Sequence, residues 1–179
     1  TRLVEIGRRL EAHQRVANVL FVASGNADTK EQKAAILMEV ARIYEDLLGD
    51  RSRAEEIYGQ VVALDPTDAE LVLPAARSLE RLYAGAEHAK QLADILRLEV
   101  RLEADGEKRR ELWGRLGELC ETVLEDQDGA IGAWRARLED DAADERALSA
   151  LERLYERTNA HRELVQTLRA REQVSKDQD

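Results

Sequence analysis

The sequence has very little of the residues that staple small folds or build sheets. It holds one cysteine and two prolines among 179 residues, and only 4% of the residues are aromatic. The single thiol, Cys120, cannot form an internal disulfide, and no second thiol is present to make a metal or redox pair with it. The abundance of Ala, Leu, Glu and Arg favours long helices over strands, because these residues lose least on entering a helix.

The chain also lacks long apolar runs and an excess of positive charge. No apolar run approaches the roughly 18 residues of a membrane span, so we expect no membrane insertion. Its 27 basic and 37 acidic residues give a net charge of -10, which repels phosphate backbones and argues against a nucleic-acid partner. The sequence begins with Thr1, without an initiator Met or the core of a signal peptide. We therefore interpret the chain as a fragment of a longer protein and expect that protein to be cytoplasmic.

An internal repeat is the most informative feature that is present. The five letters of Leu79–Tyr83 recur without change at Leu151–Tyr155. These two copies are 72 positions apart. Many other similar residues are 76 positions apart, a distance that we call the repeat offset: Glu31 and Glu107, Val40 and Leu116, Asp50 and Asp126, Ala54 and Ala130, Tyr58 and Trp134, Asp65 and Asp141, Asp68 and Asp144. Self-similarity at a fixed period is the signature of a repeat architecture.

Within each period, apolar residues return every three or four positions, as on one face of a helix. Two capping boxes, Thr29 with Gln32 and Ser52 with Glu55, predict helix starts. Pro74 predicts a kink or a fresh helix start after a lead-in over 67–73, because proline lacks a backbone donor. The predicted helices, about ten, are 2–10, 12–24, 30–48, 52–63, 69–84, 88–104, 107–125, 128–139, 145–157 and 160–174.

Each period thus holds four helices, or two antiparallel hairpins. A lone hairpin cannot bury both of its faces, so stability must come from stacking on the next hairpin. We therefore predict an all-α fold, a right-handed α-solenoid that forms a single domain over 1–179. Its five hairpins would be 2–25, 30–64, 69–105, 107–140 and 144–175.

The chain resembles the tetratricopeptide-repeat (TPR) family. Trp113, Leu116 and Gly117 stand in the family's W-x-x-L-G arrangement, although Cys120 replaces the tyrosine expected next. The other matches are Ala130 and Trp134 in the later copy, and Leu37, Val40, Ala41, Tyr44, Ala54, Tyr58 and Pro66 in the earlier one. The resemblance implies a TPR-like solenoid in which the small residues allow close helix contact and the aromatic residues fill the gaps.

The resemblance also implies a binding face, because the first helix of each hairpin in this family lines a concave surface that holds a peptide or a partner helix. Transferred to this sequence, the candidate binding residues are Glu39, Arg42, Arg77, Arg81, Arg115, Glu118, Arg153 and Arg157. The same faces would carry Met38, Glu45, Ala84, Thr122 and Ser149. Arginine forks suit an acidic or C-terminal carboxylate ligand, but we favour the reading that these arginines pair with glutamates on neighbouring helices.

Residues with catalytic chemistry form no pattern. The three histidines, His13, His88 and His161, lack metal-ligand spacing, and Gly114 and Gly117 do not follow the strand that a phosphate-binding loop needs. We expect Cys120 to be a buried, inert thiol and the acidic run 139–145 to be a solvated corner. The sequence therefore predicts no enzyme activity, no cofactor and no metal.

The predicted function is a non-catalytic scaffold for protein–protein interaction, with a protein or peptide partner. Two alternatives stay open: a structural spacer without a ligand, and an accessory or regulatory domain of a larger enzyme such as a kinase or protease. Leu3, Ile6 and Leu10 form an apolar stripe on the first helix, which suggests self-association through the exposed N-terminal helix.

Overall fold

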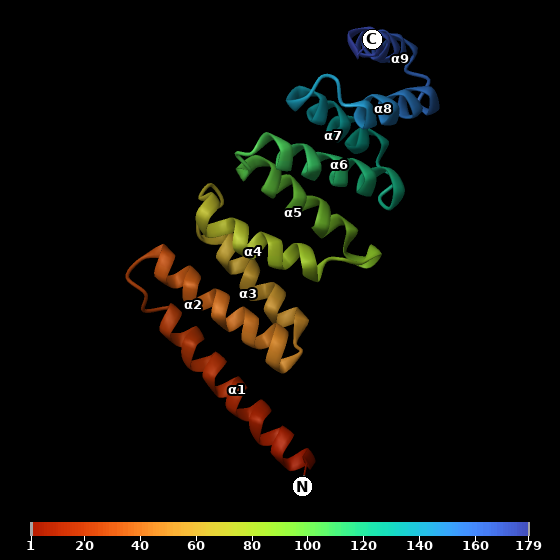
Figure 1. Cartoon of the computed structure of the whole chain (residues 1–179). Helices are drawn as coiled ribbons and strands as arrows, with labels where there is room; N and C mark the ends of the chain where they lie inside the picture. Colours follow the sequence, from red (N-terminus) through yellow and green to blue (C-terminus); the bar gives the residue numbers. More distant parts are fainter. Residues whose placement is uncertain (1, 179) are drawn as a thin grey trace. The chain divides into compact units, whose positions relative to one another are not determined.

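The computed structural model describes the backbone of residues 2–178 and the side chains of residues 9–176. These residues form nine α-helices and no strand (Figure 1). In chain order the helical segments are α1 (Arg2–Ser24), α2 (Lys30–Arg42), the π-helix η1 (Ile43–Leu48), α3 (Arg51–Leu64), α4 (Ala69–Leu82), the 3-10 helix η2 (Ala86–His88), α5 (Ala89–Leu102), α6 (Gly106–Thr122), α7 (Gln127–Asp140), α8 (Glu145–Arg157) and α9 (His161–Gln178). The predicted all-α class is confirmed.

The chain divides into two compact units, Thr1–Ala84 and Gly85–Asp179, which we call unit 1 and unit 2. In unit 1, α1, α2, α3 and α4 each pack on the next helix, and in unit 2 the same holds from α5 through α9. The repeat offset carries the second half of α1 onto α5, and α2, α3 and α4 onto α6, α7 and α8. Each unit is therefore one copy of the repeat seen in the sequence, and unit 2 carries α9 in addition.

Aspartates start most of the helices. Five helix N-caps are aspartates whose carboxylates accept backbone N–H groups of the first turn: Asp50, Asp68, Asp105, Asp126 and Asp144. These bonds satisfy donors that would otherwise have no partner in the helix. Because Asp50 and Asp68 are related to Asp126 and Asp144 by the repeat offset, the caps help to give both units the same backbone.

The cap of one predicted capping box is confirmed, although the Gln32 side chain accepts the N–H of Asp28 and not that of Thr29, and the other box is wrong. Thr29 Oγ1 accepts the backbone N–H of Gln32 at 3.2 Å, at the start of α2. Ser52, in contrast, lies inside α3, and Asp50 caps that helix by accepting the N–H of Arg53 at 3.0 Å. A carboxylate slightly earlier in the chain takes the capping position.

Two predicted breaks do not exist. The expected helices 2–10 and 12–24 are one continuous helix, α1, so the expected hairpin 2–25 is wrong and there are nine described helices rather than ten (Figure 1). Good helix formers, Glu11 and Ala12, stand where the break was expected. Nor does a helix start at Pro74, since α4 begins at Ala69 and runs through the proline. Pro74 lies close to the helix start, where few intrahelical bonds depend on its missing N–H.

The end of the predicted helix 30–48 holds a feature that the sequence did not predict. Its last six residues form the π-helix η1, which Gly49 ends with a φ of 68°. The backbone N–H of Asp50 then returns to the carbonyl of Tyr44 at 2.8 Å. In unit 2, the N–H of Asp126 bonds the carbonyl of Cys120 at 2.9 Å, and Glu125 takes the positive φ, 54°. Both units therefore end this helix with the same turn.

The TPR-like signature residues form the core of each unit. In unit 2, Leu116, Ala130 and Trp134 are buried in one cluster. A Cβ atom on Gly117 would lie 2.6 Å from Cε2 of Trp134, so the indole needs glycine at this place. Cys120 is fully buried in the same cluster, and burial raises the pKa of its thiol. These contacts agree with packing roles for the signature residues and for Cys120.

Candidate functional site

The eight candidate binding residues divide evenly between the two units. Their side chains are all exposed, on α2 and α4 in unit 1 and on α6 and α8 in unit 2. We call α2 and α4, and likewise α6 and α8, the first helices of their units. Unit 1 contributes Glu39, Arg42, Arg77 and Arg81, and unit 2 contributes Arg115, Glu118, Arg153 and Arg157.

Arg81 is held by an ion pair between the first helices of unit 1. Its Nη2 atom lies 2.9 Å from both carboxylate oxygens of Glu45, and its Nε atom donates to Glu45 Oε1 at 3.2 Å. The Tyr58 hydroxyl donates to the same carboxylate at 2.9 Å. Burial, followed by the bond to Glu45, raises the pKa of Tyr58 to about 12. Arg81 therefore serves the packing of α4 on η1 and α3.

The same ion pair recurs in unit 2. Glu121, which the repeat offset relates to Glu45, pairs with Arg153 at 3.6 Å and with Arg157 at 3.8 Å. Glu118 forms an ion pair with Arg146 on the same two helices. Recurrence at equivalent positions favours the reading that these arginines pair with glutamates on neighbouring helices.

Three candidate residues of unit 1 have no such partner. Glu39, Arg42 and Arg77 form no ion pair within residues 9–176. Arg42 lies one turn after Met38 on α2, and Arg77 lies one turn after Pro74 on α4, so each continues the face of the residue before it. Their charged groups remain available to a ligand on these two helices.

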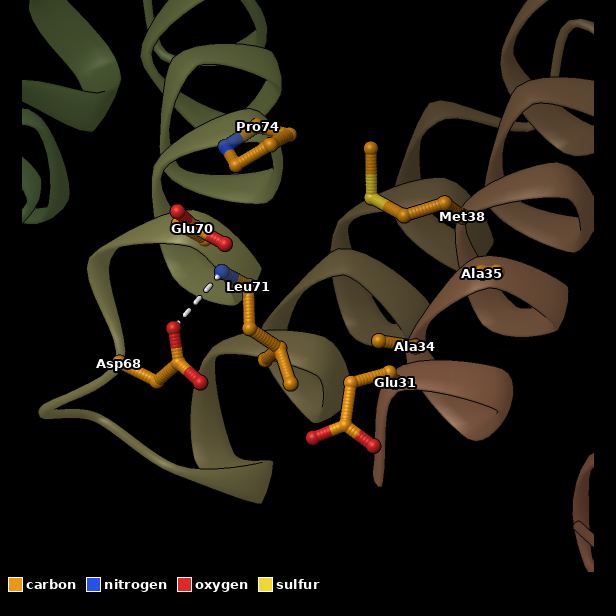
Figure 2. Close-up of a pocket in the computed structure, with 8 residues that line it drawn as sticks. All are labelled: Glu31, Ala34, Ala35, Met38, Asp68, Glu70, Leu71 and Pro74. Carbon is orange, nitrogen blue, oxygen red and sulfur yellow. Dashed lines mark hydrogen bonds between the residues drawn. The ribbon is translucent and has the colours of Figure 1, made fainter. Parts of the chain in front are cut away.

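Unit 1 has a hollow between α2 and α4, which we call hollow 1. It has a volume of about 320 Å³. Its lining residues are Glu31, Ala34, Ala35, Met38, Asp68, Glu70, Leu71 and Pro74 (Figure 2). Figure 2 shows Met38 and Pro74 at one end and the carboxylates of Glu31 and Asp68 at the other, with Leu71 between them. Of these lining residues, the sequence predicted only Met38 on the binding face, because the lining of a cavity depends on how two helices pack.

The acidic end of hollow 1 carries net negative charge. The Thr29 hydroxyl, with the Glu31 backbone N–H, lowers the pKa of Glu31, and Asp68 Oδ1 accepts the N–H of Leu71 at 3.2 Å. Two helix N-termini supply roughly half a positive charge each, which three carboxylates exceed. The hollow thus offers apolar contact at one end and a place for a cation at the other.

The equivalent place in unit 2, hollow 2, has a different lining. Its volume is also about 320 Å³, and it is lined by Glu107, Arg110, Glu111, Arg137 and Arg146. Arg137 enters from α7, where its Nε atom donates to Asp144 Oδ2 at 2.8 Å and Nη1 donates to the Arg110 carbonyl at 3.0 Å. Burial, the largest single effect, opposes ionisation of Asp144, but the bond from Arg137, the Ala147 backbone N–H and the charges of Arg137 and Arg110 together keep the pKa of Asp144 below its ordinary value.

The other two arginines of hollow 2 also have partners. Arg110 pairs with Asp141, and the guanidinium of Arg146 lies 5.7 Å from the ring centroid of Trp134. Gly114 leaves room for the Arg137 guanidinium, because a Cβ atom there would collide with Nη1. The arginines of hollow 2 are therefore part of a structural network.

The histidine, cysteine and acidic side chains of the described residues form no metal-binding cluster. Within the residues that the structure describes, no group of three or more His, Cys, Asp and Glu side chains could hold a metal ion. The acidic run 139–145 is the corner between α7 and α8, where Asp140 pairs with Arg109 and Asp141 with Arg110. Among the same residues, no helix is long and apolar enough to cross a membrane.

Comparisons with known proteins identify the class of fold. No family model matches the chain, and no curated protein matches it. A solved structure of TPR-like repeats is similar over 99% of this chain and 90% of its own, with a TM-score of 0.51 and 16% identity; it comes from a Podosopora anserina chain assigned as a kinesin light chain, whose repeats are nearly identical. The crystal structure of MamA is similar over 94% of this chain and 88% of its own, with a TM-score of 0.50 and 19% identity. The fold is thus a TPR-like helical-repeat fold of the α-solenoid class, as the sequence predicted.

Proposed function

We propose that this chain is a non-catalytic scaffold for protein–protein interaction, and that a peptide or a partner helix binds to the first helices of unit 1. The TPR-like fold supports protein partners in general. Hollow 1 is the observation that supports this particular surface, because it combines an apolar floor with unpaired charged groups on the same two helices. At about 320 Å³ it lies near the lower end of ligand-site volumes, which suits one or two side chains of a peptide.

The unpaired residues Glu39, Arg42 and Arg77 would contact the same ligand, one turn beyond hollow 1. The remaining candidates, Arg81, Arg115, Glu118, Arg153 and Arg157, would have supporting roles, since most of them are held by ion pairs between helices. An interface gains most from a few well-packed contacts, so we assign the energy to the apolar floor of the hollow.

Selection from a displayed library of random peptides tests this proposal. The immobilised chain should enrich peptides whose binding is lost in Ala35→Arg, because a long side chain at this exposed position on α2 fills hollow 1. Ala63→Arg is the matched control, since Ala63 is an exposed alanine on α3 of the same unit. Binding should survive the control with less than about a twofold change, as expected for a surface position away from the interface.

The alternatives predict other outcomes. A structural spacer would enrich no peptide, and an accessory domain of a larger enzyme would bind only segments of its own full-length protein. A third possibility is that the ligand binds to the arginines and not to hollow 1. Changing Arg81, Arg115 and Arg153 to Glu tests it. If that variant abolishes binding while Ala35→Arg leaves it unchanged, the ligand uses the arginines and hollow 1 is not the site.

Self-association through α1 is a second proposal, supported by a separate observation. Val16, Val19 and Val22 follow one another at a spacing of three on α1 and are exposed, whereas Leu10 is exposed on another face of the helix and the side chains of Leu3 and Ile6 lie outside the described residues. An exposed apolar stripe of this kind is typical of an interaction surface. Val19→Lys should lower the apparent mass in sedimentation equilibrium if copies associate through this stripe. We also propose a cytoplasmic location, which cell fractionation of the full-length protein tests.

A further inference from the structure

One place in the repeat is filled by aromatic side chains in unit 1. The phenol of Tyr44 lies against α1, where Gln14 Nε2 donates to its hydroxyl at 2.8 Å and Asn18 Oδ1 lies 3.5 Å from it. The guanidinium of Arg53 lies 5.6 Å from the ring centroid of Phe21 and 6.0 Å from that of Tyr44. Tyr44, Phe21 and Arg53 thus fill the space between α1 and the turn that starts α3.

The equivalent place in unit 2 has lost all three of these side chains. At the repeat offset, Cys120 replaces Tyr44, Arg97 replaces Phe21 and Gly129 replaces Arg53. A hollow of about 300 Å³ is found there, which we call hollow 3. It is lined by Lys90, Ala93, Asp94, Arg97, Leu124 and Asp126, each of which the repeat offset relates to a residue around Tyr44 in unit 1.

We propose that hollow 3 binds the phenol ring of a tyrosine side chain from a partner protein. Ala93 and Leu124 provide apolar contact for the ring. Lys90 and Asp94 stand where Gln14 and Asn18 hold the hydroxyl of Tyr44, so an amine can donate to the ligand hydroxyl and a carboxylate can accept from it. The contacts in unit 1 show that this position of the repeat holds a phenol, where Tyr44 lies in η1 and its equivalent Cys120 lies near the end of α6.

The charges of hollow 3 favour a neutral ligand. Two cations, Lys90 and Arg97, are balanced by two carboxylates, and Asp94 pairs with Arg97 at 3.0 Å. A phosphorylated tyrosine would bring about two negative charges next to Asp94 and Asp126, so the unmodified side chain fits better. Hollow 3 lies between α5 and the turn that follows α6, and no residue of hollow 1 or hollow 2 lines it. This site is therefore independent of the proposed peptide surface in unit 1.

Titration with N-acetyltyrosinamide, followed by ¹⁵N–¹H NMR of the whole chain, tests the proposal. Saturable shift changes should concentrate in residues 90–97 and 124–126, with the weak affinity expected of a small ligand. N-acetylphenylalaninamide should bind at least about fivefold more weakly, because it leaves Lys90 and Asp94 without the hydroxyl. Equal binding of the two compounds, or no saturable change, would overturn the proposal.

Variants with a large side chain in hollow 3 show whether the ligand binds there. Cys120→Tyr should reduce binding at least about tenfold, because its own phenol fills hollow 3. Cys120 is fully buried, so Lys90→Trp serves as a second variant, which fills the hollow from an exposed position on α5. The matched control, Lys108→Gln, changes an exposed lysine on α6 that does not line hollow 3, and it should retain binding within about threefold. Unchanged binding in both filling variants would show that the ligand binds elsewhere.

The same NMR titration distinguishes a site for a small free phenol from a site for a tyrosine side chain. If p-cresol binds in hollow 3 but N-acetyltyrosinamide does not, the hollow excludes a peptide backbone and the proposal of a partner side chain fails. If both bind with similar shift changes, the proposal holds.

Discussion

Units 1 and 2 share one backbone plan but place their cavities differently. Around the first helices, unit 1 has an apolar hollow with an acidic end, whereas unit 2 has a network of paired arginines. Around Tyr44 the order is reversed, because unit 1 is filled and its equivalent in unit 2 is open. Caps, turns and small residues set the fold in both copies, and a few side chains decide where each copy can bind a ligand.

Substitutions at four equivalent positions of the copies explain the arginine network, and two of them place Arg137. Val61 is fully buried in unit 1, and Arg137 takes the equivalent position in unit 2. A guanidinium cannot remain in an apolar core without partners, so it reaches Asp144 and the Arg110 carbonyl. Gly114, which stands where unit 1 has Met38, gives it room. With Arg110 in place of Ala34 and Arg146 in place of Glu70, these changes replace an apolar hollow by ion pairs.

The largest expected effect comes from removing the main aromatic residue of unit 2. Trp134 is 2% exposed, so Trp134→Ala should destabilise the protein by about 3–5 kcal/mol through lost burial and the cavity left behind. Urea unfolding followed by the fluorescence of Trp113, the remaining tryptophan, reports on unit 2. Tyr58→Ala is the counterpart in unit 1 and should leave the fluorescence transition closer to that of the unmodified chain. A loss below about 1 kcal/mol for Trp134→Ala would contradict the packing described here.

An intermediate effect is expected where two contacting side chains differ in size between the units. Gly117 faces Trp134, whereas the equivalent pair in unit 1 is Ala41 and Tyr58. Gly117→Ala should therefore destabilise unit 2 by about 1–3 kcal/mol, because the indole must move. Adding Trp134→Tyr should recover part of that loss by recreating the pair found in unit 1. Additive losses in this double-mutant cycle would show that the two residues do not interact.

Much of the fold was predictable because it depends on local signals. Asp50 and Asp126, and Asp68 and Asp144, cap equivalent helices, and their common spacing was visible in the letters. The prediction divided α1 into two helices, although the residues at the expected break favour helix. The π-helix η1 was missed because apolar spacing does not distinguish an α-helix from a single π turn.

Less of the candidate site was predictable, because it depends on contacts between distant residues. The sequence favoured the pairing of arginines with glutamates on neighbouring helices, and Arg81 with Glu45 bears this out. It did not predict hollow 1, since Met38 and Pro74 are far apart in the sequence and meet only when α2 and α4 pack together. A comparison of Tyr44 with Cys120 would have indicated hollow 3, because a large side chain gives way to a small one at a buried position.

A smaller effect is expected from the turn that ends the first helix of each unit. Gly49 and Glu125 both have a positive φ, which costs about 1–2 kcal/mol for a residue with a side chain. Glu125→Gly should therefore stabilise unit 2 by up to about 1 kcal/mol, and Gly49→Ala should destabilise unit 1 by a similar amount. Far-UV circular dichroism during thermal unfolding measures both changes. Destabilisation by Glu125→Gly would mean that Glu125 makes a contact worth more than the strain.

The smallest effect concerns the turn before α4, where Lys30 binds Asp65 at 2.8 Å and the Thr67 hydroxyl bonds Asp65 at 2.7 Å. Mainly through the Lys30 bond, with help from Thr67, the pKa of Asp65 falls to about 2, below its ordinary value of 3.8. A carboxylate with a lowered pKa in the folded state stabilises the fold above its unfolded pKa and loses this contribution as the pH falls from about 4 to about 2. The difference in unfolding free energy between the unmodified chain and Asp65→Asn should therefore shrink across this window, as measured by urea unfolding with circular dichroism. Because Lys30 is largely exposed, added salt should also reduce the difference at neutral pH. A difference that stays constant from about pH 5 to about pH 2 would show that the ionised carboxylate contributes nothing to this turn.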